Sequence, residues 1–195
     1  MGRKSNAEAR RNEIVQALYA CLSEKGHEKV TTKEIALQAG LAPGVIHYYF
    51  KSKDEIVTCL MDQLAEKYQE LFGEKIQELS NSSDFLKAFG NFLCDEFVFD
   101  QGLNRVFYNL VQMGFESQVV AKPLRLLMES YRAQGNLYFR QLYSPIKNAG
   151  YLVVALIEGL ALQWMIEPDN SRKEDIRNLV QFTMNGILSA EQATQ

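Results

Sequence analysis

The side chains that most often carry chemistry are sparse in this chain of 195 residues, which holds three cysteines and two histidines. Cys21, Cys59 and Cys94 lie far apart and form no CxxC pair. The sequence therefore predicts reduced, buried thiols, with a redox-sensing thiol as the alternative. Neither His27 nor His47 is followed by a second ligand three or four residues later, so we expect no structural metal site.

Sequence signatures of enzymes are also missing. We find no GxSxG, no glycine-rich phosphate loop, no HExxH pair and no nucleophile placed beside a base. The sequence therefore argues against an enzyme and predicts no cofactor.

Charge is unevenly distributed along the chain. Residues 1–53 contain nine Lys and Arg against five Asp and Glu, whereas residues 54–195 contain twelve against nineteen. A basic N-terminal segment followed by an acidic remainder indicates that the N-terminal segment binds an anion. The chain shows no apolar signal segment at its start, and its longest apolar run, residues 151–157, is too short to cross a bilayer. We therefore expect a cytoplasmic protein.

The elements that must position these residues are helices. Hydrophobic residues make up 47% of the chain, four prolines interrupt it, and no segment shows sustained strand alternation. The sequence predicts an all-α fold of about nine helices, with one domain at residues 1–53 and a second at residues 54–195. The helices are expected near residues 6–25, 31–40, 43–50, 53–79, 84–99, 103–115, 119–142, 146–166 and 172–189, with a turn at 81–84.

The local signals are clearest in the N-terminal domain. Thr31 with Glu34, and Ser52 with Glu55, have the spacing of a capping box, in which each residue of the pair bonds a backbone N–H near the start of a helix. Gly40 stands where the chain needs a positive φ to leave a short helix.

The segment from Thr32 to Lys53, TKEIALQAGLAPGVIHYYFKSK, has the pattern of a helix-turn-helix. Two short helices meet at a tight turn, and the small Ala36 allows them to approach closely. The positions that must face inward are Ile35, Ala36, Ala39, Leu41 and Ile46.

The run from Gly40-Leu41 through Ile46-His47-Tyr48-Tyr49-Phe50-Lys51-Ser52-Lys53-Asp54-Glu55 resembles the signature of the TetR family of transcriptional regulators. In that signature a recognition helix ends in an aromatic cluster, followed by a lysine and the start of a long connecting helix. The resemblance covers roughly residues 10–60, and the segment 158–164 is similar to one common late in these regulators.

The resemblance implies a ligand-responsive repressor that binds a palindromic DNA operator as a homodimer and is released by a small effector. The alternative is an all-α dimeric small-molecule-binding protein or enzyme that does not bind DNA.

The N-terminus of the 31–40 helix offers free backbone N–H groups and a positive dipole end, so its first residues could bind a phosphate or simply cap the helix. The two tyrosines of the aromatic cluster could reach a phosphate through their hydroxyls or belong to the core. An acid would suit the start of the connecting helix better than Lys53 does, which favours a phosphate nearby. The candidate phosphate contacts are Thr31, Thr32, Lys33, Tyr48, Tyr49 and Lys53.

The recognition helix opens with Ala42, Pro43, Gly44 and Val45, which cannot make bidentate hydrogen bonds to base edges but can contact thymine methyl groups. His47 is the polar side chain there that is able to bond a base. Specificity can also draw on DNA shape and on basic side chains near the backbone or minor groove, namely Arg3, Lys4, Arg10 and Arg11.

Of two late helices, 146–166 carries apolar residues on more than one side, which predicts burial on two sides, and 172–189 carries apolar residues at helical spacing. Such helices would dimerise as a four-helix bundle, as the resemblance also implies, and a monomeric core is the alternative. The predicted interface residues are Leu156, Gly159, Leu160, Leu179, Thr183 and Ile187.

The middle helices are rich in aromatic residues, which form either a core or the pocket that the resemblance implies. Since few charges fall among them, we expect an apolar or aromatic effector. The predicted lining residues are Phe89, Leu93, Phe107, Leu110, Met113, Tyr131 and Trp164.

Overall fold

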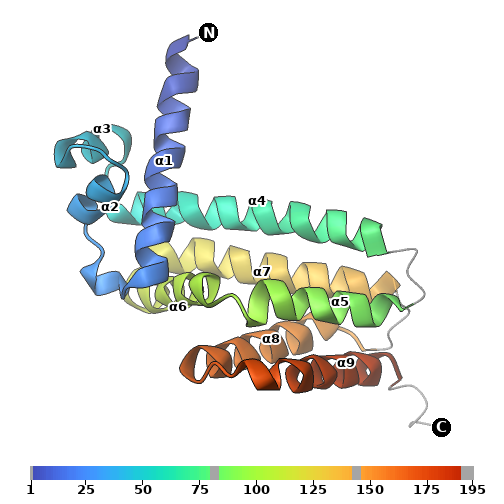
Figure 1. Cartoon of the computed structure of the whole chain (residues 1–195). Helices are drawn as coiled ribbons and strands as arrows, with labels where there is room; N and C mark the ends of the chain where they lie inside the picture. The colour runs from blue at the N-terminus through green and yellow to red at the C-terminus, as the bar shows by residue number, and fades with distance from the viewer. Residues whose placement is uncertain (1, 80–83, 142–145, 190–195) are drawn as a thin grey trace. The chain divides into compact units, whose positions relative to one another are not determined.

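The computed structural model describes residues 2–79, 84–141 and 146–189, and every regular element in these ranges is helical (Figure 1). The all-α prediction is confirmed, whereas most of the turn expected at 81–84 lies outside the described residues. The α-helices are α1 (Gly2–Glu24), α2 (Thr32–Gln38), α3 (Ile46–Tyr49), α4 (Lys53–Leu79), α5 (Phe85–Leu93), α6 (Gln101–Glu116), α7 (Gln118–Gln141), α8 (Ala149–Ile166) and α9 (Lys173–Ser189).

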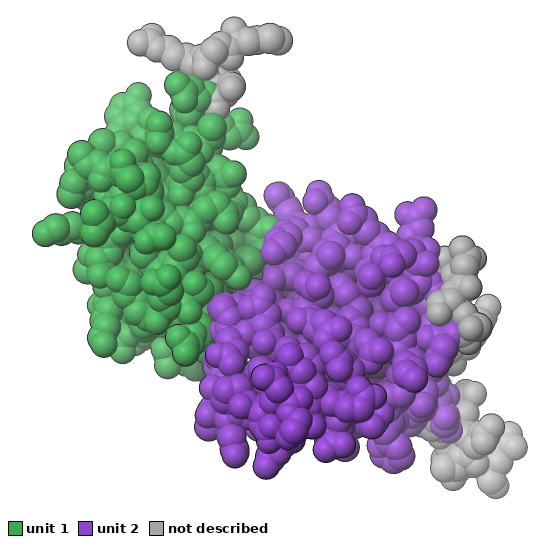
Figure 2. Space-filling view, viewed as in Figure 1, with its two compact units in different colours: residues 1–65, 105–127 green, residues 66–104, 128–195 purple. Residues whose placement is uncertain are grey.

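The chain forms two compact units (Figure 2). Unit 1 comprises residues 1–65 and 105–127, and unit 2 comprises residues 66–104 and 128–195. Helices α4, α6 and α7 each have residues in both units. The boundary predicted after residue 53 separates two functions, whereas these two units are defined by packing. The boundary therefore stays a prediction.

The first predicted capping box is present at the start of α2. Thr31 Oγ1 accepts a hydrogen bond from the Glu34 N–H, and the Glu34 carboxylate accepts one from the Thr31 N–H, both at 3.2 Å. The second box is only half formed. Ser52 Oγ accepts from the Glu55 N–H at 3.2 Å, but the Glu55 carboxylate accepts from the Lys51 N–H at 2.8 Å.

The turn after α2 depends on Gly40, whose φ is 67° as predicted. The Leu41 N–H bonds Ala36 O at 2.8 Å and the Gly40 N–H bonds Leu37 O at 3.1 Å. This pair of bonds satisfies two carbonyls at the end of α2 and reverses the chain toward the recognition segment.

Two expected helices are divided in the structure. The expected helix 43–50 is a 3-10 turn (Pro43–Val45) followed by α3. In the 3-10 turn the Val45 N–H bonds Ala42 O at 2.9 Å. The expected helix 84–99 is α5 followed by a π-helical turn (Cys94–Val98), closed by the Phe99 N–H on Cys94 O. Further 3-10 turns lie at His27–Lys29 and Asn170–Arg172.

Each unit has its own core. In unit 1 the apolar stripe of α1 packs against α2 and α3. The fully buried residues of this unit include Ile14, Leu18, Leu22, Ile35, Ile46, Phe50, Ile56 and Leu60. In unit 2, α5 packs on α9 and α8 packs on the 94–98 turn. The core there is largely aromatic and includes Phe89, Phe92, Tyr138, Phe139 and Trp164.

Helix α8 is more apolar than its short uninterrupted apolar run suggested. By length and composition it could cross a membrane, with a mean hydropathy of 1.7 over 18 residues. A single such helix is weak evidence, because the core helix of a soluble protein passes the same test. Here Val153, Ile157 and Trp164 of α8 lie in the core of unit 2.

Gly40→Ala should lower the free energy of unfolding by about 1 kcal/mol, because a Cβ is strained at positive φ. Gly44→Ala is the matched control, since Gly44 has no positive φ and a Cβ there meets nothing within 4 Å. Urea denaturation measures both. Equal stability of the two variants would contradict the structural role given to Gly40.

Candidate nucleic-acid interface

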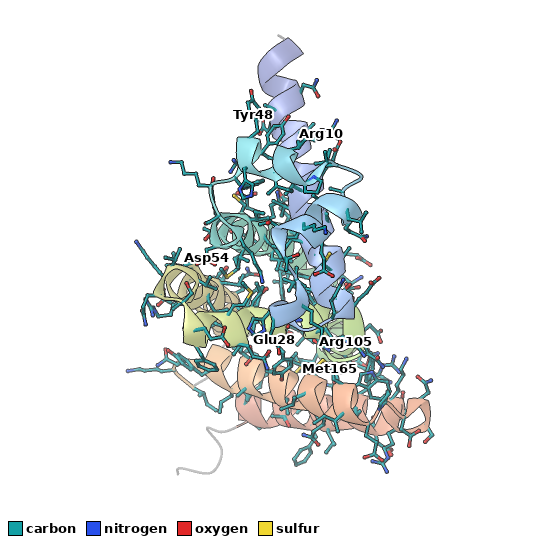
Figure 3. All side chains as sticks on the ribbon, turned by 90° about the vertical axis from the view of Figure 1, so that its left-hand side faces the viewer. Arg10, Glu28, Tyr48, Asp54, Arg105 and Met165 are labelled. Carbon is teal, nitrogen blue, oxygen red and sulfur yellow. The ribbon has the colours of Figure 1, made fainter. Side chains whose placement is uncertain are left out.

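The outward side of the helix-turn-helix carries most of the predicted contact residues. The exposed ones are Thr31, Lys33, Ala42, Pro43, Gly44, His47 and Tyr48, while Thr32, Val45 and Tyr49 are half-buried. Tyr48, whose side chain is drawn in Figure 3, is 83% exposed. Its ring makes an edge-to-face contact with Tyr49, at a centroid distance of 4.9 Å. The opposite side, with Ile35, Ala36 and Ile46, is buried as predicted.

The surface that results is small and has few polar groups. Pro43 and Gly44 keep the 3-10 turn free of long side chains, and a Cβ on Gly44 would face open space. A backbone presented in this way can approach another surface closely. The candidates for hydrogen bonds on it are therefore His47, the two tyrosine hydroxyls and the exposed start of α2.

Arg11 holds the C-terminal end of α3 against α1 and α4. Its guanidinium donates to Tyr49 O and to the Glu55 carboxylate, the latter at 3.2 Å, and lies 3.9 Å from the centre of the Phe50 ring. A cation at a helix C-terminus is favourable because it faces the negative end of the helix dipole. The structure thus gives Arg11 a role inside the protein.

The other basic residues near the N-terminus differ. Arg10 pairs with Glu13 on the surface of α1 at 2.5 Å. The side chains of Arg3 and Lys4 lie outside the described residues, so their proposed place near DNA stays a prediction.

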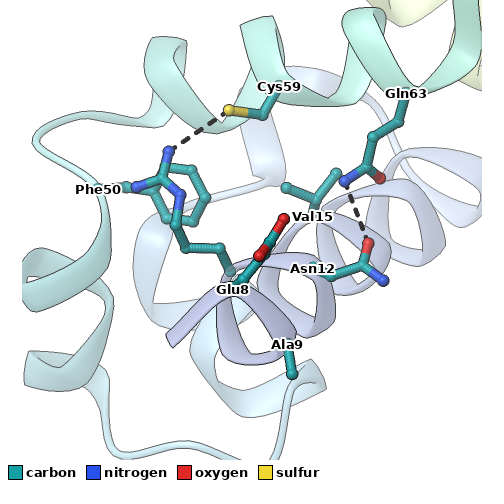
Figure 4. A pocket seen from close by; sticks show the side chains of 8 residues that line it. Glu8, Ala9, Asn12, Val15, Phe50, Cys59 and Gln63 are labelled. Carbon is teal, nitrogen blue, oxygen red and sulfur yellow. Dashed lines mark hydrogen bonds between the residues drawn. The ribbon is translucent and has the colours of Figure 1, made fainter. Parts of the chain in front are cut away.

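A half-open pocket of about 480 Å³ lies beside Arg11, between α1 and α4 (Figure 4). Cys59 forms part of its wall, with its Sγ 3.5 Å from an Arg11 nitrogen.

The three cysteines differ in burial, since Cys59 is half-buried whereas Cys21 and Cys94 are buried. Desolvation raises the pKa of the Cys21 thiol, and it raises the pKa of the Cys94 thiol to about 12. Two of the three thiols are thus buried as predicted.

Lys53, a predicted phosphate contact, has a partner inside unit 1. Its ammonium donates to His27 O at 2.7 Å, and burial lowers its pKa despite nearby acids such as Asp54 and Glu116. The predicted phosphate contact is untested, but the geometry gives this lysine a structural role.

Asn109 is a positioning residue that the sequence did not reveal. This buried α6 side chain donates to Leu22 O at 2.9 Å and Lys25 O at 3.1 Å, and accepts from the His27 N–H at 2.8 Å. It therefore satisfies carbonyls at the C-terminal end of α1 that have no partner within the helix. The available signal was an amide among the buried apolar positions of α6, because a buried amide requires hydrogen-bond partners.

Further bonds surround this anchor. His27 is 7% exposed, and its Nε2 lies 3.1 Å from the Glu116 carboxylate. Ser117 Oγ, between α6 and α7, donates to the Asp54 carboxylate at the start of α4 at 2.9 Å. Side-chain bonds thus tie the α1–α2 connection and the start of α4 to the α6 end of unit 1.

The predicted effector-lining residues fall in both units. Leu110 and Met113 are buried and Phe107 is half-buried in unit 1. Phe89, Leu93 and Trp164 are buried and Tyr131 is half-buried in unit 2, where Trp164 packs against Phe99 at a centroid distance of 4.7 Å. Neither unit by itself brings all seven residues together, and their role stays a prediction.

The predicted interface residues also differ in burial. Ile187 is 4% exposed and belongs to the core of unit 2, while Leu156 and Leu160 are half-buried against that core. Thr183 is half-buried and donates to Leu179 O at 2.9 Å. Leu179 is 55% exposed, and a Cβ on Gly159 would meet nothing within 4 Å. Four further large apolar side chains of α8 and α9, not predicted as interface residues, are exposed: Leu152, Leu162, Ile166 and Phe182.

Comparison with known proteins agrees with the helix-turn-helix. The profile of "Bacterial regulatory proteins, tetR family" matches residues 14–58. The "Fatty acid metabolism regulator protein" of Bacillus subtilis is 31% identical over 74 residues, which is 38% of each protein. The "HTH-type transcriptional regulator BetI" of Klebsiella pneumoniae is 26% identical over 165 residues, covering 79% of this chain and 81% of that one.

Solved structures share the whole fold. A transcriptional regulator from Rhodococcus sp. has a TM-score of 0.74 at 20% identity, covering 92% of this chain and 96% of its own. A TetR transcription regulator from Haloarcula marismortui has a TM-score of 0.68 at 21% identity, covering 93% of this chain and 100% of its own.

The helix-turn-helix and the helical fold around it define a helix-turn-helix transcriptional regulator. Residues 14–58 belong to the DNA-binding domain of the TetR family, whose members are transcriptional regulators and not enzymes.

Lys53→Met should lower the free energy of unfolding by about 2 kcal/mol, because it removes a charged donor from a partly buried carbonyl. Urea denaturation measures the change, and Lys51→Met, at an exposed side chain nearby, is the control. If Lys53→Met leaves stability unchanged and weakens only DNA binding, the structural role is wrong and the phosphate contact is favoured.

Proposed function

We propose that this protein is a ligand-responsive transcriptional repressor that binds a palindromic operator as a homodimer in the cytoplasm. The observation that carries the proposal is the helix-turn-helix, whose inner side is buried while its start of α2 and its 3-10 turn are exposed. The basic excess of residues 1–53 supports an anionic partner.

In this proposal the 3-10 turn and α3 enter the major groove. Ala42, Pro43 and Val45 contact thymine methyl groups, Gly44 allows close approach, and His47 bonds one base edge. The start of α2, with Thr31, Thr32 and Lys33, binds a phosphate through its N–H groups and its lysine. The hydroxyls of Tyr48 and Tyr49 reach phosphates on either side.

Two variants separate base contacts from phosphate contacts. Lys33→Met should weaken binding equally on all sequences and lower the salt slope by about one unit, since the exposed lysine neutralises one phosphate. His47→Ala should instead change the preference at one base pair, by about 1–3 kcal/mol. Gel shifts on DNA from upstream of the coding sequence, at several salt concentrations, measure both.

Leu126→Met, at an exposed side chain of α7, is the control variant in the gel shifts. If the parent binds this DNA no better than a scrambled duplex, the repressor is ruled out in favour of a ligand-binding protein without DNA binding.

The homodimer that we propose uses the exposed apolar surface of α8 and α9, called here the α8/α9 face. It has small residues that allow close approach, because a Cβ at Gly159 or Gly186 meets nothing within 4 Å. A second copy would cover large apolar side chains at near-heptad spacing, as in a four-helix bundle. These residues are Leu152, Leu162, Ile166, Leu179 and Phe182.

Phe182→Glu should convert the dimer to a monomer, because a charge at a 77% exposed residue of the α8/α9 face would be buried in the dimer. Phe115→Glu is the matched control, since Phe115 is 85% exposed on α6, outside this face. Sedimentation equilibrium measures both. A Phe182→Glu protein that remains dimeric would rule out this interface.

A two-fold dimer places its two recognition segments on half-sites whose centres are about 34–36 Å apart or somewhat further. We propose that the effector binds among the middle helices and that α4, which begins beside the recognition segment, tilts in response. The coupling is reciprocal, so operator DNA weakens effector binding by the factor by which the effector weakens DNA binding.

A further inference from the structure

Two polar atoms on α7 are buried in unit 2 with no hydrogen-bond partner among the described residues. They are the side-chain oxygen of Gln134 and the hydroxyl of Tyr138, a residue that is 1% exposed. Leaving a buried polar group unpaired costs about 1–3 kcal/mol, and such groups are rare in folded proteins. Two of them on one helix therefore indicate a partner that the described residues do not supply.

The two residues share one face of α7. Residues four apart on a helix are neighbours, with Cβ atoms about 5–6 Å apart. Helical side chains lean toward the N-terminus, so we expect the Tyr138 ring to extend over the turn that carries Gln134. The Gln134 amide nitrogen already donates to Ser130 Oγ, one turn earlier, at 3.5 Å. Its oxygen is thus left for a donor from elsewhere.

Aromatic rings surround this position. Tyr138 stacks on Phe89 at a centroid distance of 4.0 Å and on Phe85 at 5.4 Å. From Phe89 the ring contacts continue through Phe72, Phe97 and Tyr68 to Tyr131, which lies seven residues before Tyr138 on α7. Tyr138 therefore lies at one end of a continuous aromatic cluster, one helical turn after Gln134.

We infer that Gln134 and Tyr138 bind the hydroxyl group of a neutral aromatic effector, a phenol. This inference rests on the proposed function, because it assigns a chemical class to that effector. A hydroxyl has one donor and two acceptor lone pairs, so a single group can donate to Gln134 Oε1 and accept from Tyr138. If the Gln134 amide were flipped, the same hydroxyl could accept from its nitrogen instead.

The surroundings favour a neutral ligand over an ion. Desolvation raises the pKa of the Tyr131 and Tyr138 hydroxyls, and it also raises the pKa of Glu158 on α8 despite the nearby Arg132. An environment that disfavours charge on its own groups also disfavours it on a ligand. Aromatic rings, by contrast, stack readily on the cluster.

The test compares 4-propylphenol with 4-propyltoluene, in which a methyl group replaces the hydroxyl, by calorimetric titration of the full chain. We expect the phenol to bind about tenfold tighter or more, because a site built to bond a hydroxyl rejects an analogue without it. Tyr138→Phe and Gln134→Leu should each remove most of this preference and leave binding of 4-propyltoluene in place. Tyr151→Phe, at an exposed tyrosine of α8, should retain it.

Stability gives an independent readout. Without a probe, Tyr138→Phe should be at least as stable as the parent, because it removes an unpaired buried hydroxyl. Lower stability would indicate a structural bond, such as one to a fixed water, and would overturn the inference. Equal affinity for the two probes, no binding of either probe, or a preference for the phenol that survives in both variants would also overturn the inference. DNA binding is measured separately, so failure of the proposed repressor is distinguishable from failure of this site.

Discussion

The side-chain amide of Asn109 fixes the connection on which the helix-turn-helix depends. Helix α1 ends with carbonyls that no N–H of the helix can reach, and Asn109 donates to two of them while accepting from the His27 N–H. Lys53 donates to the carbonyl of the same His27. The peptide groups that lead from α1 into α2 are therefore held from both α6 and the start of α4.

This constraint matters because the two helices of the helix-turn-helix are too short to be stable alone. Helix α2 has seven residues and α3 has four, far below the length at which isolated helices persist in water. Their positions come from packing on α1, from the Gly40 turn and from Arg11 at the end of α3. The exposed surface can thus consist of small residues, since the buried side holds its shape.

The local features of the fold could be predicted from the sequence. Helical periodicity, the Thr31 and Glu34 capping box and the positive φ of Gly40 all arise from residues close together in the chain. The partners of Asn109 and Arg11 could not, because they lie up to 87 and 48 residues away and no local spacing reports them. The side of α9 that faces inward was also undetermined, because more than one side is apolar. In the structure Ile187 faces the core and Phe182 is exposed.

The most direct test of this account is the operator affinity of Asn109→Leu, with Asn104→Leu as its match. Both residues are buried asparagines of α6, but the Asn104 side chain donates to the nearby Val98 O, six residues away, and not to the α1–α2 connection. At a temperature where both variants are folded, Asn109→Leu should bind operator DNA about tenfold more weakly than the parent, although no DNA-facing residue has changed. Asn104→Leu should lose stability but keep its affinity. An Asn109→Leu protein that binds the operator as tightly as the parent would contradict the account.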